Sequence, residues 1–351
     1  MRFSKIFAED IESLISDKAV PWEKFRGGSV IITGATGLIG QGCAVVLGEL
    51  NRLYNYNIRI LAVGRNAQKG EELKTIQGVE FIRADIKERL EIKGGVDYII
   101  HCAAVTKSSE MLSNPVGLIE TDLTGIKNVL ELAYKKSAKG FIYTSSMESY
   151  GILDLPEIRE TDQGYIDLAN PRNCYPMCKR MSEMLCNCFY SQYGLPVNIV
   201  RLSMTFGAGR DFSHDNRVWA QFARCALNGS PIVLHTSGES LSAVTYMADA
   251  LRGMFLVLLA APRGETYNIA STHMKIREMA ERIGHKFGLE AVVHPPDDIG
   301  VRGYASEFKL PLNSDKIKTI GWNPKVTRIE DMFERVLADA RQNSTISMGG
   351  D

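Results

Sequence analysis

The sequence predicts an α/β fold, in which a doubly wound parallel sheet is followed by a smaller C-terminal lobe. Short apolar runs rich in β-branched residues alternate with helical segments from Gly28 to about Val200, as strands and helices do in a parallel sheet. A glycine-rich loop joins the first run to the first helix. Beyond Arg201 the alternation becomes irregular, so the second lobe is expected there. A length of 351 residues suits two lobes around one sizeable core.

The first strand and the loop after it predict a dinucleotide site. Residues 29–33 form an apolar run typical of a buried strand. The loop Gly-Ala-Thr-Gly-Leu-Ile-Gly at 34–40 then leads into a helical segment at 41–50. Its glycines permit a tight turn and the close approach of a pyrophosphate, which the helix N-terminus also favours. The alternative is an ordinary glycine-rich turn. In a Rossmann-like site the loop contacts would come from Gly34, Thr36, Gly37, Leu38, Ile39 and Gly40.

The next strands predict where the adenosine half of the cofactor lies. The run 58–63 ends at Gly64-Arg65-Asn66, and no Asp or Glu stands there for the ribose hydroxyls. Arginine suits a 2′-phosphate, so NADP is favoured over NAD, with a solvent-facing loop arginine as the alternative. Further strands are expected at 79–85 and 96–104. They would bring four more residues to the cofactor: Asp85 and Ile86 beside the adenine, and the small Ala103 and Ala104 along its path.

A tyrosine and a lysine downstream predict the chemistry. The strand 140–146 ends in hydroxyl side chains, and Tyr175 and Lys179 stand four residues apart, on one face of a predicted helix. The ammonium group would lower the pKa of the phenol toward the working pH, so the tyrosine would serve as acid and base. Lysine could also hold the nicotinamide ribose. A different face, marked by Met184, Leu185, Cys188 and Phe189, is expected to pack on the sheet. The alternative is an incidental Tyr/Lys pair.

With these residues the sequence resembles the extended short-chain dehydrogenase/reductases, in the branch of NAD(P)-dependent nucleotide-sugar epimerases and dehydratases. The resemblance runs from about Gly28 to Pro324 and includes the glycine loop, residues 101–104, 145–151 and the Tyr175/Lys179 pair. It implies that Ser146 is the catalytic serine. It also implies a tightly bound cofactor that is regenerated in each cycle, a transient 4-keto sugar, and a homodimer.

Glu148 is similar in position to a glutamate of 4,6-dehydratases and UDP-glucuronate decarboxylases, where it serves as a base or polar anchor near the sugar. The 4-keto group acidifies the neighbouring C–H bond, so one carboxylate could begin an elimination. A surface glutamate in a loop is the alternative. The resemblance therefore favours a dehydratase or decarboxylase, with a sugar epimerase or an NADPH-dependent reductase as the second possibility. A non-catalytic dinucleotide-sensing protein is the third.

Several positions depart from the pattern of the family. Met147 replaces a proton-donating aspartate, Met204 a phosphate- or sugar-binding asparagine, and Ser242 an arginine that clamps the diphosphate. Asp122 replaces a common structural asparagine. Arg210, Arg217 or Arg302 could supply the missing phosphate contacts. The residues predicted to line the substrate site are Ser145, Met147, Met204, Arg217 and Ser242.

Composition points to a cytoplasmic enzyme. Lysine plus arginine and aspartate plus glutamate both number 41, so no net charge attracts nucleic acid or an anionic membrane. The 7 cysteines do not indicate a disulfide framework, and no metal site is expected. The apolar run 254–262 is too short to span a membrane. Acidic residues near the N-terminus interrupt any secretion signal. The expected partners are therefore a small-molecule substrate and a second subunit.

The predicted organisation has four parts. Residues 1–26 form an extension whose apolar positions have helical spacing, so it should dock on the body or on a second subunit. Residues 27–200 form the cofactor domain. Residues 201–341 form mainly the substrate lobe, with 243–270 returning partly to the cofactor domain. The polar, glycine-ended residues 342–351 are expected to be a loose tail.

Overall fold

A computed structural model describes residues 3–209, 211–294 and 307–348. Its largest sheet has seven strands, all parallel, in the order β10-β6-β5-β4-β1-β2-β3. This confirms the predicted doubly wound sheet. The strands are β1 (Ser29–Thr33), β2 (Arg59–Gly64), β3 (Val79–Arg83), β4 (Tyr98–His101), β5 (Gly140–Ser146), β6 (Val197–Leu202) and β10 (Thr266–Ile269).

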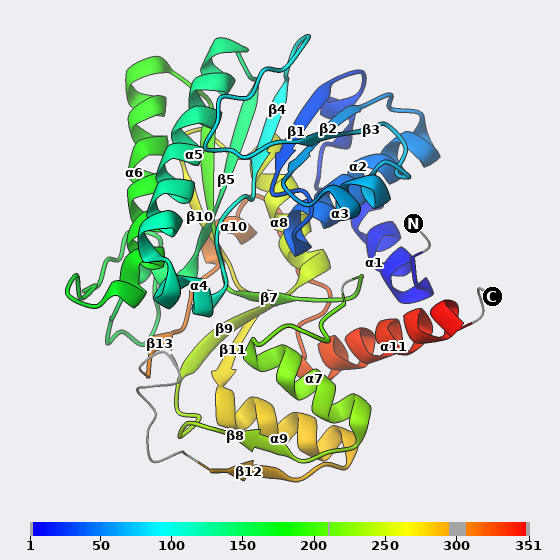
Figure 1. Cartoon of the computed structure of the whole chain (residues 1–351), viewed down its shortest axis with the longest axis vertical. Helices are drawn as coiled ribbons and strands as arrows, with labels where there is room; N and C mark the ends of the chain where they lie inside the picture. The colour runs from blue at the N-terminus through cyan, green and yellow to red at the C-terminus, as the bar shows by residue number, and fades with distance from the viewer. Residues whose placement is uncertain (1–2, 210, 295–306, 349–351) are drawn as a thin grey trace.

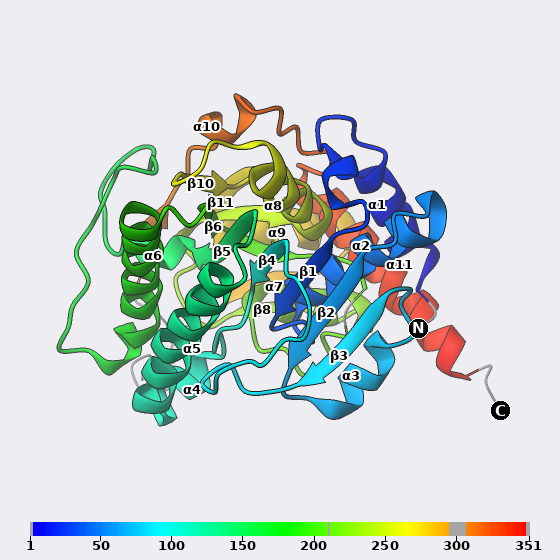
Figure 2. The ribbon, with the colours of Figure 1, turned by 90° about the horizontal axis from the view of Figure 1, so that it is seen from above.

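Helices cover both faces of this sheet, as Figure 2 shows from above. One face packs against α1 (Lys5–Ile15), α2 (Leu38–Tyr54) and α8 (Met247–Ala260). The other packs against α5 (Pro115–Lys135) and α6 (Cys174–Tyr193), with the short α4 (Ser108–Ser113) beside α5. Strand alternation divides the core, because Val30 and Ile32 face the first layer and Ile31 the second. The short helix α3 (Ala67–Leu73) lies against β3 at the sheet edge.

The smaller lobe lies beyond the carboxyl ends of the strands (Figure 1). Its main sheet contains β7 (Met204–Phe206), β9 (Leu241–Tyr246), β11 (Thr272–Lys275) and β13 (Lys309–Leu310). A second sheet pairs β8 (Ile232–Leu234) with β12 (Ala291–Val293), and the helices are α7 (Val218–Asn228), α9 (Ile276–Phe287) and α11 (Ile329–Met348). Within 243–270, α8 packs on the large sheet and β10 is a strand of it. The short α10 (Asp315–Lys318) also packs on β10.

The N-terminal extension docks on the body of its own chain. Ser4 caps α1, and Phe7, Ile11 and Leu14 are buried in the main core. Helix α1 contacts α2 and α8 of the large domain as well as α11 of the small lobe. The prediction of a loose tail from residue 342 differs from the structure, because α11 continues to Met348. The backbone N–H of Lys5 donates to Oε1 of Gln342 at 2.9 Å, so this part of the helix is tied to α1.

The apolar pattern predicts the buried face of α6 only in part, because Leu185 and Phe189 pack against the sheet layer and the other two predicted positions do not. Met184 is 57% exposed and Cys188 is also exposed, whereas Tyr175 and Lys179 are buried against the sheet. The buried positions follow a helical period from Tyr175 to Cys186 and include polar side chains. The prediction failed at Met184 and Cys188 because exposed side chains were assigned to the core, and it missed Lys179 because a lysine is seldom fully buried.

Candidate active site

The glycine loop has the conformation that a tight phosphate-binding turn requires. Gly34 has a φ of +67°, and a Cβ there would lie 2.7 Å from the backbone N of Ala103. The N–H of Gly37 donates to the carbonyl of Gly34 at 2.9 Å, and α2 begins at the next residue. A Cβ at Gly40 would collide with the Gly34 carbonyl. A side chain at 34 or 40 would therefore displace the backbone, and the loop fits a dinucleotide pyrophosphate at the start of α2.

The residues predicted for the adenosine half gather at the carboxyl ends of β2 and β3. Nη1 of Arg65 lies 3.9 Å from Oδ2 of Asp85, and the arginine side chain is 65% exposed. Ala103 and Ala104 follow β4 and are half-buried beside the loop. The side chain of Ile86, in contrast, is buried in the core against α5. Arg65 can therefore leave Asp85 to bind a ligand with little loss of free energy, because an exposed ion pair at this distance is weak.

Ser146, Tyr175 and Lys179 meet at the end of β5. The Ser146 side chain lies close enough to the Tyr175 phenol to lower the pKa of that group. Nζ of Lys179 donates to the carbonyl of Thr144 at 2.9 Å and lies 5.7 Å from the centre of the Tyr175 ring. Both side chains are buried, at 7% exposure for the tyrosine and 3% for the lysine. The structure therefore brings together, at one strand end, the three residues that are predicted to carry the acid/base chemistry.

Burial dominates the electrostatics of this cluster. It raises the pKa of Tyr175, and the charge of Glu148 raises it further, while the Ser146 side chain and the charge of Arg172 lower it. Burial also lowers the pKa of Lys179, against the opposing effect of Asp122. The expected net lowering of the tyrosine pKa by the lysine is therefore not found. His101, buried and close to the Lys179 charge, has its pKa lowered to about 3 and is neutral.

Glu148 pairs with an arginine that the sequence did not single out. The glutamate lies on the 3-10 helix η2 (Met147–Tyr150), directly after Ser146, whose Oγ accepts the N–H of Glu148 at 3.2 Å. Nη1 of Arg172, on the 3-10 helix η3 (Pro171–Asn173), donates to Oε2 of Glu148 at 2.7 Å. The position of Arg172, three residues before Tyr175, is the signal that could have identified it.

Asp122 is a second charged group that sequence analysis noted but did not place in the site. It lies on α5, 4% exposed, and its Oδ1 accepts the N–H of Val105 at 3.3 Å. Its Oδ2 is buried and has no hydrogen-bond partner among the described residues. Burial raises the pKa of Asp122, and the nearby Lys179 lowers it. A buried carboxyl group therefore stands behind the Tyr175/Lys179 pair.

Ser145 and Ser242, predicted to meet the substrate, are committed to internal bonds. Ser145 points to the opposite face of β5 from Ser146 and donates to Glu183 of α6, which also holds Arg201 at 2.6 Å. Ser242 is fully buried in β9, and its Oγ donates to the carbonyl of Ala243 at 3.2 Å. Strand alternation and burial turn both hydroxyls away from solvent, and a substrate contact at either position stays a prediction.

The remaining predicted substrate residues are dispersed. Met147 is 9% exposed in an apolar cluster with Tyr150 and Ile158, and Met204 is half-buried in β7 beside that cluster. Arg217 lies at the start of α7, where its Nε donates to Asp215 at 3.0 Å. Arg210 and Arg302 lie outside the described residues. The structure therefore leaves the phosphate contacts of a substrate as predictions.

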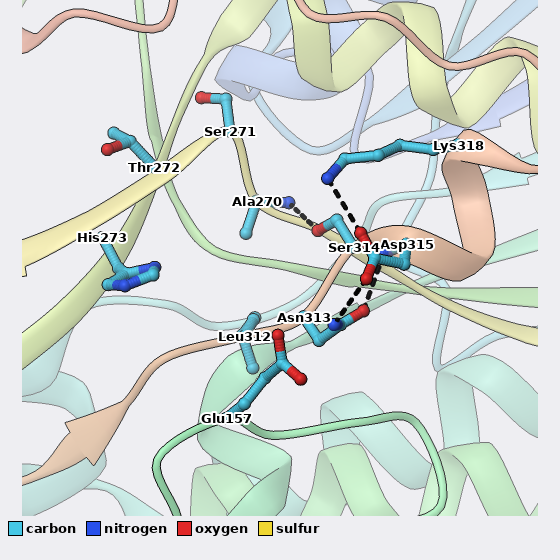
Figure 3. A pocket seen from close by; sticks show the side chains of 10 residues that line it. All are labelled: Glu157, Ala270, Ser271, Thr272, His273, Leu312, Asn313, Ser314, Asp315 and Lys318. Atoms are coloured by element: carbon cyan, nitrogen blue, oxygen red, sulfur yellow. Dashed lines mark hydrogen bonds and ion pairs between the residues drawn. The ribbon is translucent and has the colours of Figure 1, made fainter.

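A separate pocket of about 320 Å³ opens near the junction of β10 and α10 (Figure 3). It is lined by polar groups that already bond one another, such as Ser314 with the N–H of Ala270 and Lys318 with Asp315. None of Ser146, Glu148, Tyr175 and Lys179 lines it. The chemistry is therefore assigned to the end of β5 and not to this pocket.

Metal and disulfide chemistry find no support in the described part of the chain. No group of three or more histidine, cysteine, aspartate or glutamate side chains within it is placed to hold a metal ion. All seven cysteines are free thiols. A search of the helices in the same residues finds none with the length and apolar character needed to cross a bilayer.

Comparison with known proteins agrees with this geometry. The model of the NAD dependent epimerase/dehydratase family matches residues 30–270. UDP-glucuronic acid decarboxylase 3 of Arabidopsis thaliana is 29% identical over 85% of this chain and 84% of the relative. UDP-glucuronic acid decarboxylase 1 of Xenopus tropicalis is 31% identical over 52% of this chain and only 42% of the relative. A dTDP-glucose 4,6-dehydratase structure from Streptomyces venezuelae, with NAD and TYD bound, is 21% identical and covers 91% of this chain and 98% of its own, at a TM-score of 0.73.

Proposed function

Because the chain belongs to the NAD dependent epimerase/dehydratase family, we propose that it modifies a nucleotide-activated sugar through a transient 4-keto intermediate. The observation that carries this proposal is the meeting of Ser146, Tyr175 and Lys179 at the end of β5, with Glu148 one turn away. The glycine loop at Gly34, which follows β1 of the same parallel sheet, supports an NAD(P) cofactor at the carboxyl ends of the strands.

Tyr175 is the group that moves the proton. As phenolate it accepts the proton of the sugar 4-hydroxyl, and Ser146, which lies close to the phenol, orients that hydroxyl. Lys179, whose Nζ lies 5.7 Å from the ring centre, favours the phenolate when the lysine is protonated. The bound nicotinamide would take up the hydride from C4 and return it later. Gly34, Gly37 and Gly40 would hold its pyrophosphate.

Met147 favours decarboxylation over loss of water. Elimination of water needs an acid for the leaving hydroxyl, and the buried thioether of Met147 has no proton to give. In a 4-keto uronate the carboxylate is β to the ketone. The C5–C6 bond can therefore break as carbon dioxide leaves, with its electron pair passing into the enolate, and C5 then takes a proton. Glu148 stands next to Met147 as the charged group at this end of the site.

The test is mass spectrometry of nucleotide sugars incubated with the protein in deuterated water. UDP-glucuronate that loses carbon dioxide and gains deuterium at C5 is the expected result. Loss of water from UDP-glucose or dTDP-glucose would instead establish a dehydratase. A panel that stays unchanged would overturn the nucleotide-sugar proposal.

An epimerase or a net reductase is the second candidate. It is favoured by the buried Ser242, which leaves no diphosphate clamp at that position. In the same experiment, deuterium incorporation without loss of mass would indicate epimerisation next to the carbonyl. Consumption of NADPH in proportion to substrate would indicate a reductase.

We further infer that the cofactor is NADP in preference to NAD. Arg65 stands at the end of β2, exposed and only weakly paired with Asp85, where a 2′-phosphate would lie in this type of fold. Arg65→Ala is expected to weaken NADP binding by about 1–3 kcal/mol and to leave NAD binding nearly unchanged. Calorimetric titration with both nucleotides measures this, and an equal loss for both would contradict the preference.

The protein is also proposed to form a homodimer through the outer surface of α5 and α6. Both helices cover one face of the large sheet, and their outer sides expose large apolar side chains that a monomer rarely leaves in water. A second copy of the same surface would cover them symmetrically. The side chains concerned are Val116, Ile119, Tyr134, Met181, Met184, Tyr190 and Tyr193.

A further inference from the structure

Arg172 is a largely buried charge with no role in the chemistry described so far. Its side chain is 16% exposed, and its Nη1 donates to Oε2 of Glu148, which is 33% exposed, at 2.7 Å. Its Nε is buried and has no hydrogen-bond partner among the described residues. A guanidinium removed from water in this way is costly unless its partner compensates. The ion pair with Glu148 is therefore the contact that compensates for burying the Arg172 guanidinium.

The ion pair joins the two segments that carry the candidate catalytic groups. Glu148 lies on η2, which follows Ser146 directly, and Arg172 lies on η3, which ends one residue before α6 begins. The chain that connects η2 to η3 is much longer than either of these two short helices. A bond across this connection therefore fixes the serine end of β5 against the tyrosine end of α6.

Charges of both signs surround the Tyr175 phenol. Glu148 from η2 and Asp122 from α5 are negative and raise its pKa, whereas Arg172 from η3 is positive and lowers it. Lys179, from the same helix as the tyrosine, lies 5.7 Å from its ring centre. Glu148 and Arg172 thus act on the phenol in opposite directions. The carboxylate can stand close to the phenol because the guanidinium offsets its charge.

We propose that Arg172 is a positioning residue, which holds the Glu148 carboxylate at the sugar end of the site and cancels its charge at Tyr175. This inference rests on the proposed function, since it assigns a role within the same site. Without the guanidinium, an uncompensated carboxylate would face the phenol and oppose its ionisation.

The first experiment isolates the hydride step. UDP-xylose lacks the C6 carboxylate, so Glu148 has no group to act on, and reduction of the cofactor is followed by absorbance against pH. Arg172→Gln is expected to move the rate profile to higher pH, and Arg172→Lys to keep the wild-type profile. The Glu148→Gln/Arg172→Gln double variant should return toward wild type. An unshifted Arg172→Gln profile would overturn the proposal.

Arg180 provides the matched control. It lies on α6 and donates to the carbonyls of Ser149 and Tyr150 at 2.9 and 3.0 Å, so it also anchors η2, without pairing with Glu148. Arg180→Gln is expected to lower the melting temperature and to leave the pH profile in place. If both arginine variants shift the profile equally, the role of Arg172 is structural and the proposal fails.

A second experiment needs no substrate. The half-buried Cys174 adjoins Tyr175, and burial raises the pKa of its thiol while the charge of Arg172 opposes that rise. Alkylation of Cys174 by iodoacetamide, followed against pH by peptide mass spectrometry, should move to higher pH in Arg172→Gln and not in Arg172→Lys. An unchanged profile overturns the charge role. If no nucleotide sugar reduces the cofactor while this shift is found, the proposed function fails and the electrostatic role of Arg172 stands.

Discussion

At the scale of single residues, the protonation of Tyr175 is a balance in which burial has the largest effect. Lys179 points its ammonium to the Thr144 carbonyl, at 2.9 Å, and not directly at the phenol. Burial and Glu148 therefore raise the pKa of the tyrosine despite the nearby cation. Proton transfer depends on the groups that oppose them, Ser146 and Arg172.

Tyr175→Phe is expected to remove the hydride step and keep the fold. The ring packs with Val105 and Cys178, and phenylalanine preserves that packing. Stability should change by no more than about 1.5 kcal/mol, the usual worth of one hydrogen bond. Turnover should fall by at least about 100-fold, because acid/base catalysis is lost. Single-turnover reduction of the cofactor and thermal unfolding measure the two effects. Wild-type turnover would show that a group other than Tyr175 moves the proton.

Asp122→Asn is expected to move both the acidic and the basic limb of the pH–rate profile of the hydride step to lower pH. The Asp122 charge raises the pKa of Tyr175 and also that of Lys179. Its removal therefore lets the phenol ionise at lower pH, and lets the lysine lose its proton at lower pH. Stopped-flow rates across the pH range measure both limbs. Movement of the two limbs in opposite directions would show that Asp122 does not act through its charge.

The site was predictable where local spacing decides and not where distant segments meet. The pairing of Tyr175 with Lys179 follows from helix geometry. The contact of Glu148 with Arg172 joins two irregular segments, whose paths no periodicity describes. The orientation of Ser145 could have been predicted from the sequence. Alternation along β5 places its side chain on the opposite face from that of Ser146.

At the scale of elements, strands were predicted more closely than helix faces. β1 and β5 have the predicted bounds, because buried parallel strands are nearly continuous apolar runs with clear ends. On α6 the apolar pattern was right for Leu185 and Phe189, but Met184 is exposed and Lys179 is buried. The buried face of α6 carries side chains of the candidate active site as well as side chains of the core, and hydrophobic periodicity detects only the core side chains.

Helix α1 makes stability depend on pH through Asp10. Asp10 accepts the hydroxyl of Tyr246 at 2.5 Å and Nε of Arg335 at 2.9 Å, and burial raises its pKa from 3.8 to about 6. A raised carboxyl pKa means that the folded state binds the proton more tightly. The stabilisation is therefore complete below the unfolded pKa and is lost as the pH rises through about 6.

Comparison of the wild type with Asp10→Asn tests this. The difference in their free energy of unfolding should fall by about 2 kcal/mol between about pH 4 and about pH 7, as follows from a shift of about two units. Denaturant unfolding at several pH values measures it. A difference that is constant with pH would place the titrating group elsewhere.

At the scale of the whole molecule, the apolar outer surface of α5 and α6 is expected to control assembly. Met181→Glu/Met184→Glu places charges on this surface and should raise the dissociation constant of the dimer by at least about tenfold. Sedimentation velocity over a range of concentrations measures it. Leu53→Lys, at a similarly exposed leucine on α2 of the opposite layer, is the control and should leave assembly unchanged. Equal effects of both variants would contradict this interface.

The contact between α1 and α11 brings the two ends of the described chain together, as Figure 1 shows. The hydrogen bond between the Lys5 N–H and the Gln342 side chain places the two ends of the described chain next to each other. A short peptide joining the ends would cost little loop-closure entropy and would not cross any sheet. New termini could then be opened in an exposed loop without removing a strand. Such a circular permutant would carry α1 in the middle of its sequence, and α1 would still contact both lobes.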